Sequence, residues 1–125
     1  MSGDKYILDT NIVLYILNGE EDLISFLNHQ YLSISIITEI ELLSFPSVSK
    51  QEIREIESFI NQLDVVELDD KIKNLTIAIR KKHKLKLPDC IIAATAIANG
   101  IPLITADKQY KVITDLQLLI YDPVK

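Results

Sequence analysis

The sequence predicts the α/β fold class, as a single domain with a central parallel sheet of about five strands flanked by helices. Short apolar runs alternate with segments of helical spacing along the whole chain of 125 residues. Several runs are apolar at consecutive positions, as in strands that are buried on both faces of a parallel sheet. No Gly/Ser linker, repeat or low-complexity tract interrupts the alternation. We therefore expect one domain over residues 1–125.

The expected strands are short apolar runs bounded by polar or turn-forming residues. In chain order they cover residues 6–8, 31–37, 65–68, 102–104 and 118–121. Two expected helices follow each of the first three strands, as parallel pairing requires of its crossover connections. These helices cover residues 11–17, 21–28, 38–45, 50–63, 69–84 and 88–99.

Residues typical of helix ends support several of these boundaries. Ser49 followed by Glu52 is a capping-box pattern at the start of the helix over residues 50–63. Pro88 suits the first turn of the helix over residues 88–99, and Gly100 suits the position just past its end.

Composition restricts the class of protein. A hydrophobic content of 48% excludes disorder as the default, and no apolar stretch approaches the ~20 residues that span a bilayer. The first residues lack the order of a signal peptide, and the lone Cys90 suits a reducing compartment. We therefore expect a cytoplasmic protein without a membrane segment. The net charge of −5 argues mildly against general binding of polyanions, but allows a metal-centred site that handles one phosphate at a time.

Four acidic residues fall where an expected strand ends or an expected helix begins. They are Asp9 in KYILDTNIV, Glu41 in LSISIITEIELL, Asp89 in KLPDCIIAATAI and Asp107 in PLITADK. In a parallel α/β domain such positions gather outside the carboxyl ends of the strands. Carboxylates that meet there repel one another unless cations lie between them. Hard oxygen ligands suit Mg²⁺ or Mn²⁺, so the pattern predicts a divalent-metal site for phosphate chemistry.

Each acid also has a purely local explanation. Asp9 can cap the helix that follows it, and Glu41 has capping-box spacing from Thr38. Asp89 is favoured by the helix dipole, and Asp107 can be an ordinary turn residue. These explanations account for each acid separately but not for their shared position, which favours the metal site.

Other polar residues near these acids allow more than one interpretation. Glu39 competes with Glu41, but points roughly 200° away around the helix axis, so only one of them can face the cluster. Thr10, Asn11 and Thr105 can orient carboxylates or waters around the metal, and local capping explains them equally well.

The motifs around the four acids resemble those of PIN-domain ribonucleases, and among these the VapC-type toxins of prokaryotic toxin–antitoxin pairs. The resemblance covers nearly the whole chain and rests on LDTNIVLY, SIITEIELL, LPDCIIAATAI and PLITADKQY in this order. It implies a single PIN-like domain and a Mg²⁺- or Mn²⁺-dependent endoribonuclease that hydrolyses RNA phosphodiester bonds. By this resemblance Asp9, Glu41 and Asp89 are metal ligands, and Asp107 ligates directly or through water. The resemblance also implies a homodimer and a cognate antitoxin protein that silences the toxin.

One basic segment precedes the helix that carries Asp89. It contains Arg80, Lys81, Lys82, Lys84 and Lys86, which we expect to contact RNA phosphates beside the cleavage centre. The alternative is a solvated helix end whose cations complement the negative end of the dipole.

Two further functions stay open at this point. A housekeeping or noncatalytic PIN-domain protein would share the fold without the toxin's activity. A receiver-type phosphoacceptor signalling domain would share the length and the acidic pocket. It needs an acid pair after its first strand, however, where this chain has only Asp9.

Overall fold

The computed structural model describes residues 3–46 and 48–123. The domain predicted over residues 1–125 also includes residues 1, 2, 47, 124 and 125, which lie outside the described residues. Among the described residues, no helix is long and apolar enough to cross a membrane.

Five strands form one sheet in which every pairing is parallel, as the sequence predicts. The spatial order is β3-β2-β1-β4-β5. The strands are β1 (Lys5–Leu8), β2 (Tyr31–Ser35), β3 (Asp64–Val66), β4 (Leu103–Thr105) and β5 (Leu118–Ile120).

The helices follow the expected order. They are α1 (Thr10–Leu17), α2 (Glu21–Leu27), α3 (Ile36–Leu43), α4 (Lys50–Ile60), α5 (Asp70–Lys82) and α6 (Leu87–Asn99). A short 3-10 helix, η1 (Lys108–Val112), which the sequence analysis did not predict, connects β4 to β5.

Helix α3 begins two residues earlier than predicted. The side chain of Ser35 accepts the N–H of Ile37 and caps the helix, so β2 ends at Ser35. The predicted strand over residues 31–37 is therefore too long. The capping box considered for Thr38 and Glu41 is wrong, because Glu41 lies in the second turn of α3. This leaves the side chain of Glu41 free to serve another role.

The helix-end signals at Ser49 and Gly100 are confirmed, although α4 ends at Ile60 and α5 at Lys82, three and two residues earlier than predicted. Ser49 and Glu52 form a reciprocal capping box at the start of α4. Gly100 ends α6 in the left-handed conformation, at φ 62°, where a residue without a Cβ is favoured.

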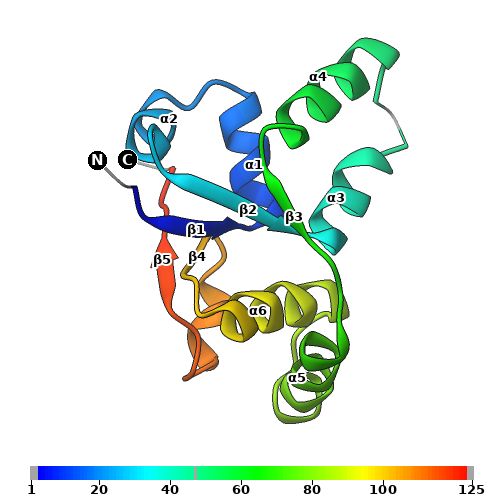
Figure 1. Cartoon of the computed structure of the whole chain (residues 1–125), viewed down its shortest axis with the longest axis vertical. Coiled ribbons are helices and arrows are strands. Elements are labelled where there is room, and N and C mark those ends of the chain that lie inside the picture. The colour runs from blue at the N-terminus through cyan, green and yellow to red at the C-terminus, as the bar shows by residue number, and fades with distance from the viewer. Residues whose placement is uncertain (1–2, 47, 124–125) are drawn as a thin grey trace.

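Helices cover both faces of the sheet, which gives a three-layer sandwich (Figure 1). Ile7 and Leu8 are consecutive in β1, so their side chains point to opposite faces. Ile7 packs in a core with residues of α5, α6 and η1, whereas Leu8 packs in a core with residues of α1 to α4. Burial on both faces explains why β1 reads as a continuous apolar run.

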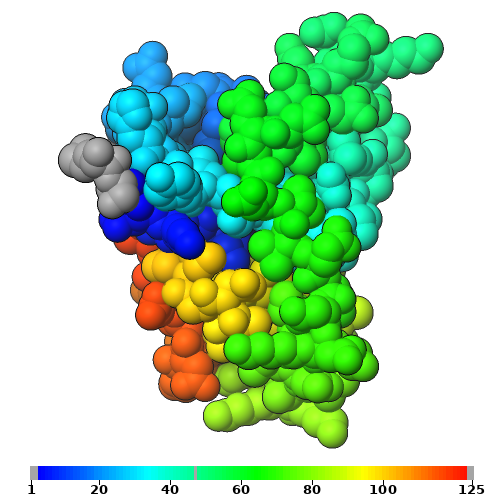
Figure 2. Space-filling view, in the orientation of Figure 1, coloured from blue at the N-terminus to red at the C-terminus, as the bar shows by residue number. Residues whose placement is uncertain are grey.

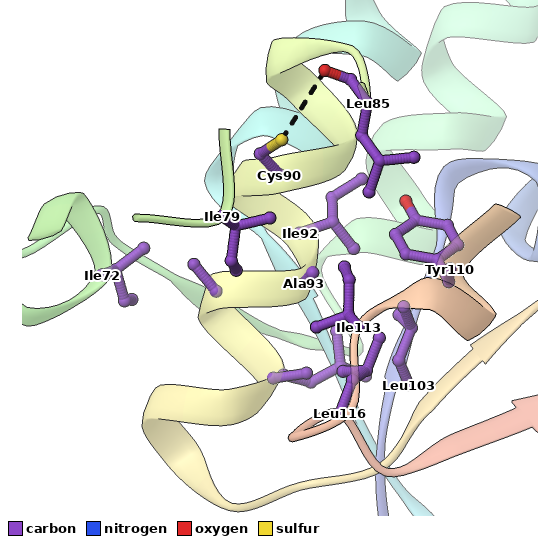
Figure 3. Close-up of a cluster of buried hydrophobic side chains, with 13 residues drawn as sticks. Ile72, Ile79, Leu85, Cys90, Ile92, Ala93, Leu103, Tyr110, Ile113 and Leu116 are labelled. Carbon is purple, nitrogen blue, oxygen red and sulfur yellow. Dashed lines mark hydrogen bonds between the residues drawn. The ribbon is translucent and has the colours of Figure 1, made fainter. Parts of the chain in front are cut away.

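Helix α6 is buried along most of its length. Its side chains from Cys90 to Ala96 are all buried. The part of α6 that reaches the surface lies between α5 and the segment that precedes β5 (Figure 2). The Sγ of Cys90 donates to the carbonyl of Leu85 at 3.7 Å, which fixes the loop that leads into the helix (Figure 3).

The chain reverses its direction across the sheet next to β1. It builds β2 and β3 on one side of β1, and then crosses to place β4 and β5 on the other side. Such a switch point leaves a crevice outside the carboxyl ends of the two central strands, where α/β proteins bind their ligands. Leu8 pairs with Ile104, so Asp9 and Thr105 follow at this crevice.

Candidate active site

Asp9 lies at the switch point, directly after β1. Its carboxylate caps α1, because Oδ1 accepts the N–H of Thr10 at 2.8 Å. Its other oxygen, Oδ2, accepts the hydroxyl of Thr105 at 2.6 Å. With 4% of its surface exposed, Asp9 is the one buried carboxylate among the described residues. The capping interpretation is therefore correct, and it is compatible with a position in a site.

Thr105 links Asp9 to Asp107. Its hydroxyl donates to Asp9 and accepts the backbone N–H of Asp107 at 3.0 Å. Asp107 in turn caps η1, because its Oδ1 accepts the N–H of Gln109 at 2.9 Å. Asn11 supports the same junction, since it donates to Asp9 Oδ2 at 3.3 Å and accepts the N–H of Ala106 at 3.2 Å.

Glu41 reaches the site from α3. Its Oε1 accepts the hydroxyl of Thr10 at 2.7 Å, and that hydroxyl also lies 3.1 Å from the hydroxyl of the buried Thr38. Glu39 instead lines a separate hollow together with Leu43 and Glu57. Of the two glutamates, Glu41 is therefore the one that contacts the residues after β1.

Asp89 enters from the first turn of α6. Its Oδ1 accepts the hydroxyl of Tyr110, from η1, at 3.2 Å. The ring of Tyr110 is 1% exposed and lies beside α6, with its hydroxyl toward the Leu85 end of the helix (Figure 3). Tyr110 was not among the residues predicted from the sequence. The available signal was a tyrosine three residues after Asp107, in a segment for which no helix or strand was predicted.

The four carboxylates act on one another electrostatically. Burial raises the pKa of Asp9 to about 6, the hydrogen bonds from Thr105 and Thr10 oppose this rise, and the charges of Asp89 and Asp107 add to it. Burial also raises the pKa of Asp89; the Tyr110 hydrogen bond lowers it, and the charges of Asp107 and Glu41 raise it. A positive charge between these groups would relieve both effects.

Tyr110 acts as a donor in this network. Burial raises the pKa of its hydroxyl far above the ordinary value of 10.0, and the nearby charges of Asp9 and Asp89 raise it further. The hydroxyl therefore stays protonated, and it donates to the Asp89 carboxylate.

The residues present fit a hard divalent cation in their chemistry. Every candidate donor is a carboxylate oxygen, and three of the four carboxylates are held by a hydroxyl from another element. Within residues 3–46 and 48–123, no three acidic, histidine or cysteine side chains lie in a ready-made ligating arrangement. Binding of a cation therefore requires the carboxylates to draw together.

The basic segment covers the last turn of α5, with Arg80, Lys81 and Lys82, and the loop that leads into α6, with Lys84 and Lys86. Lys81, Lys82, Lys84 and Lys86 are exposed, and the positive charge of Lys86 lowers the pKa of Asp89 against the effect of burial. Arg80 differs from them, because its guanidinium donates to the carbonyl of Leu85 at 2.6 Å and so holds the loop.

The fold and the four carboxylates at the switch point define an α/β protein with an acidic site. The family model described as PIN domain matches residues 6–116, and the chain belongs to this family. Comparison with curated protein sequences gives no significant match.

Several of the structural neighbours are chains of VapBC or other toxin–antitoxin complexes. A chain of VapBC-1 from nontypeable Haemophilus influenzae is 29% identical, with a TM-score of 0.79 over 93% of this chain and 97% of the other. A chain of VapBC2 from Rickettsia felis, bound to a promoter DNA fragment, is 26% identical, with a TM-score of 0.81 over 94% and 99%. A toxin–antitoxin complex from Klebsiella pneumoniae is similar at 25% identity, with a TM-score of 0.78 over 96% and 98%.

Proposed function

We propose that this chain is a single nuclease domain over residues 1–125 and a Mg²⁺- or Mn²⁺-dependent endoribonuclease. In this proposal it is the cytoplasmic toxin of a VapBC-type toxin–antitoxin pair. The observation that carries the proposal is the electrostatic coupling of the four carboxylates: in addition to burial, Asp89 and Asp107 raise the pKa of Asp9, and Asp107 and Glu41 raise the pKa of Asp89. A fold that needed no cation would gain nothing from these repulsions.

Asp9, Glu41 and Asp89 would hold the metal, with Asp107 as a direct or water-mediated ligand. When bound, the cation offsets negative charge on the scissile phosphate and lowers the pKa of water. Thr105 and Thr10 orient Asp9 and Glu41 through their hydroxyls. Asn11 keeps α1 in register with the segment after β4.

RNA would reach this centre beside the basic segment. Lys81, Lys82, Lys84 and Lys86 are exposed, so they can contact phosphates without loss of internal hydrogen bonds. Arg80 contributes charge while it holds the loop. Replacing Lys82 and Lys84 by glutamate should weaken RNA binding and reduce its dependence on salt.

The decisive test is RNA cleavage with Mg²⁺ or Mn²⁺ by purified protein from which any antitoxin has been removed. Wild type is compared with EDTA-treated protein, with Asp9→Asn, and with Asp70→Asn as a matched control. The side chain of Asp70 is 95% exposed on α5. We expect Asp9→Asn to lose more than about 100-fold in rate, because a metal site contributes several kcal/mol to catalysis. Asp70→Asn should cleave as wild type does.

Cleavage that needs neither the metal nor Asp9 would reject the proposed site. Absence of cleavage by folded, metal-binding wild type, over total RNA, would favour the noncatalytic PIN-domain alternative. A signalling domain of receiver type would instead incorporate phosphate from a small phosphodonor at an aspartate.

The proposed protein partner is a cognate antitoxin, as in the VapBC and other toxin–antitoxin complexes whose chains this chain resembles. A hollow of about 420 Å³ between α1 and α4 is suited to it. Leu14, Leu17 and Phe45 supply apolar surface there, and Glu52 and Glu55 supply negative charge. An amphipathic segment with basic residues would complement both features. Phe45→Asp should prevent formation of the toxin–antitoxin complex in size-exclusion chromatography with a coexpressed antitoxin, and should leave RNA cleavage unchanged.

A homodimer is the other proposed assembly. Ile40, Ile77 and Leu87 are exposed apolar residues on α3, α5 and α6, and surface of this kind supports association. Light scattering after size-exclusion chromatography should give twice the chain mass of 14.2 kDa. A monomer at micromolar concentration would contradict this part of the proposal.

A further inference from the structure

The short helix η1 supports two of the four carboxylates at once. Asp107 caps its start, and Tyr110, two residues before its end, donates to Asp89 across the junction with α6. Asp107 is itself tied to Thr105, which donates to Asp9. A single 3-10 turn therefore connects the first turn of α6 to the residues after β4.

The three hydroxyl-held carboxylates differ in where their donors come from. Asp9 and Glu41 are held by threonines that lie next to the acids in the site, Thr105 and Thr10. Asp89 depends on a tyrosine whose ring is anchored in the hydrophobic core with Leu103, Ile113 and other apolar residues. Since the ring is 1% exposed, the position of its hydroxyl is fixed by core packing rather than by solvent.

We propose that Tyr110 is a positioning residue of the metal centre, which uses its core-anchored hydroxyl to orient the Asp89 carboxylate for binding a divalent cation. Tyr110 touches neither the metal nor the substrate in this role. The inference rests on the metal centre of the proposed function. Outer hydroxyl and carboxylate partners of this kind commonly contribute about 10- to 100-fold to metal affinity.

The role follows from what Asp89 lacks without Tyr110. The side chain projects from the first turn of α6, and within the described residues the Tyr110 hydroxyl supplies the hydrogen bond that its carboxylate accepts. Without that donor, the carboxylate is free to rotate away from its repelling neighbours Asp107 and Glu41. Part of the binding free energy of a cation would then be used to order the Asp89 side chain, so the cation would bind more weakly.

The experiment measures Mn²⁺ affinity by isothermal titration calorimetry for wild type, Tyr110→Phe and Tyr121→Phe. Tyr121→Phe is the matched control, because the Tyr121 hydroxyl also donates to a carboxylate, Glu20, at 2.7 Å. We expect Tyr110→Phe to weaken Mn²⁺ binding by on the order of 10-fold, and Tyr121→Phe to leave it unchanged. In the Asp89→Asn background, Tyr110→Phe should have no further effect, since the two residues act as a unit.

Thermal unfolding in EDTA separates positioning from packing. Tyr110→Phe should fold, and should keep the ring contacts of the core. Failure of Tyr110→Phe to fold in EDTA would overturn the proposal, because the hydroxyl would then be a requirement of the core. Equal Mn²⁺ affinity for folded Tyr110→Phe and wild type would also overturn it, and would leave the proposed function intact. If wild type binds no Mn²⁺, both proposals are wrong.

Discussion

Replacing Asp9 by asparagine should stabilise the metal-free protein even as it removes the proposed activity. Asp9 is 4% exposed, and burial with neighbouring charges raises its pKa from 3.8 to about 6. The pKa in the folded state therefore exceeds the pKa in the unfolded state. Below about pH 4, Asp9 is protonated in both states and does not lower the free energy of unfolding. As the pH rises through about 6, the carboxylate ionises in the folded state and this part of the stability is lost.

The magnitude follows from that difference in pKa. At ~1.4 kcal/mol for each factor of ten in the ionisation constant, the ionised carboxylate costs the folded state about 3 kcal/mol. Asparagine has nearly the same shape and caps helices as well as aspartate does. Its one acceptor oxygen can keep the hydrogen bond from the Thr10 N–H, but its amide nitrogen then takes the place of Oδ2 and cannot accept the Thr105 hydroxyl. Because the loss of that hydrogen bond costs about 1–3 kcal/mol, we expect a net gain of about 1 kcal/mol in the free energy of unfolding at about pH 8.

Urea denaturation followed by circular dichroism in EDTA, from about pH 4 to about pH 8, measures this gain. The advantage of Asp9→Asn should grow as the pH rises and reach a plateau above about pH 7. Excess Mn²⁺ should reduce it, because a cation that binds only the wild-type folded state stabilises only wild type. Asp70→Asn, at an exposed aspartate, should show no such growth. A variant that is less stable than wild type at about pH 8, or an advantage that does not change with pH, would refute the reasoning.

Three further changes test the supports of the site and of the fold. Thr105→Val removes a buried hydroxyl that donates to Asp9 and accepts the N–H of Asp107. It should therefore lower the free energy of unfolding by about 1–3 kcal/mol in urea denaturation. Thr105→Ser keeps the hydroxyl and should recover most of that loss. Ser49→Ala removes the cap of α4 and should cost about 1 kcal/mol in the same assay, with unchanged Mn²⁺ affinity in calorimetry. Gly100→Ala meets no atom within 4 Å but forces a Cβ into the left-handed region, so thermal unfolding should show a loss of about 1–2 kcal/mol that comes from the backbone alone.

Much of the fold could be predicted because its signals are local. Burial on both faces makes strands such as β1 continuously apolar, and capping residues such as Ser49 and Gly100 mark helix ends by their own chemistry. The prediction was wrong where two signals overlap. Residues 31–37 are apolar except for Ser33 and Ser35, so the strand pattern continues into the helix, and the cap that Ser35 provides marks where β2 ends and α3 begins.

The site shows the same division. The sequence indicated four acids at element ends, since the connection of parallel strands makes the carboxyl edge a recurrent location for such residues. It could not choose between capping and ligation, because Asp9 caps α1 and lies in the crevice at once. It also left Glu39 and Glu41 as alternatives. The orientation of α3 about its axis decides between them, because it turns Glu41 toward Thr10 and Glu39 toward a different hollow.

The sequence by itself determined the order of elements, the parallel α/β class and the identity of the acids, because periodicity, capping and charge are properties of neighbouring residues. Only the tertiary structure decided the strand order, and with it the switch point between β1 and β4. It also decided that Tyr110 meets Asp89, a contact between residues 21 positions apart. Such contacts depend on how two helices pack on one sheet, and no local pattern encodes that geometry.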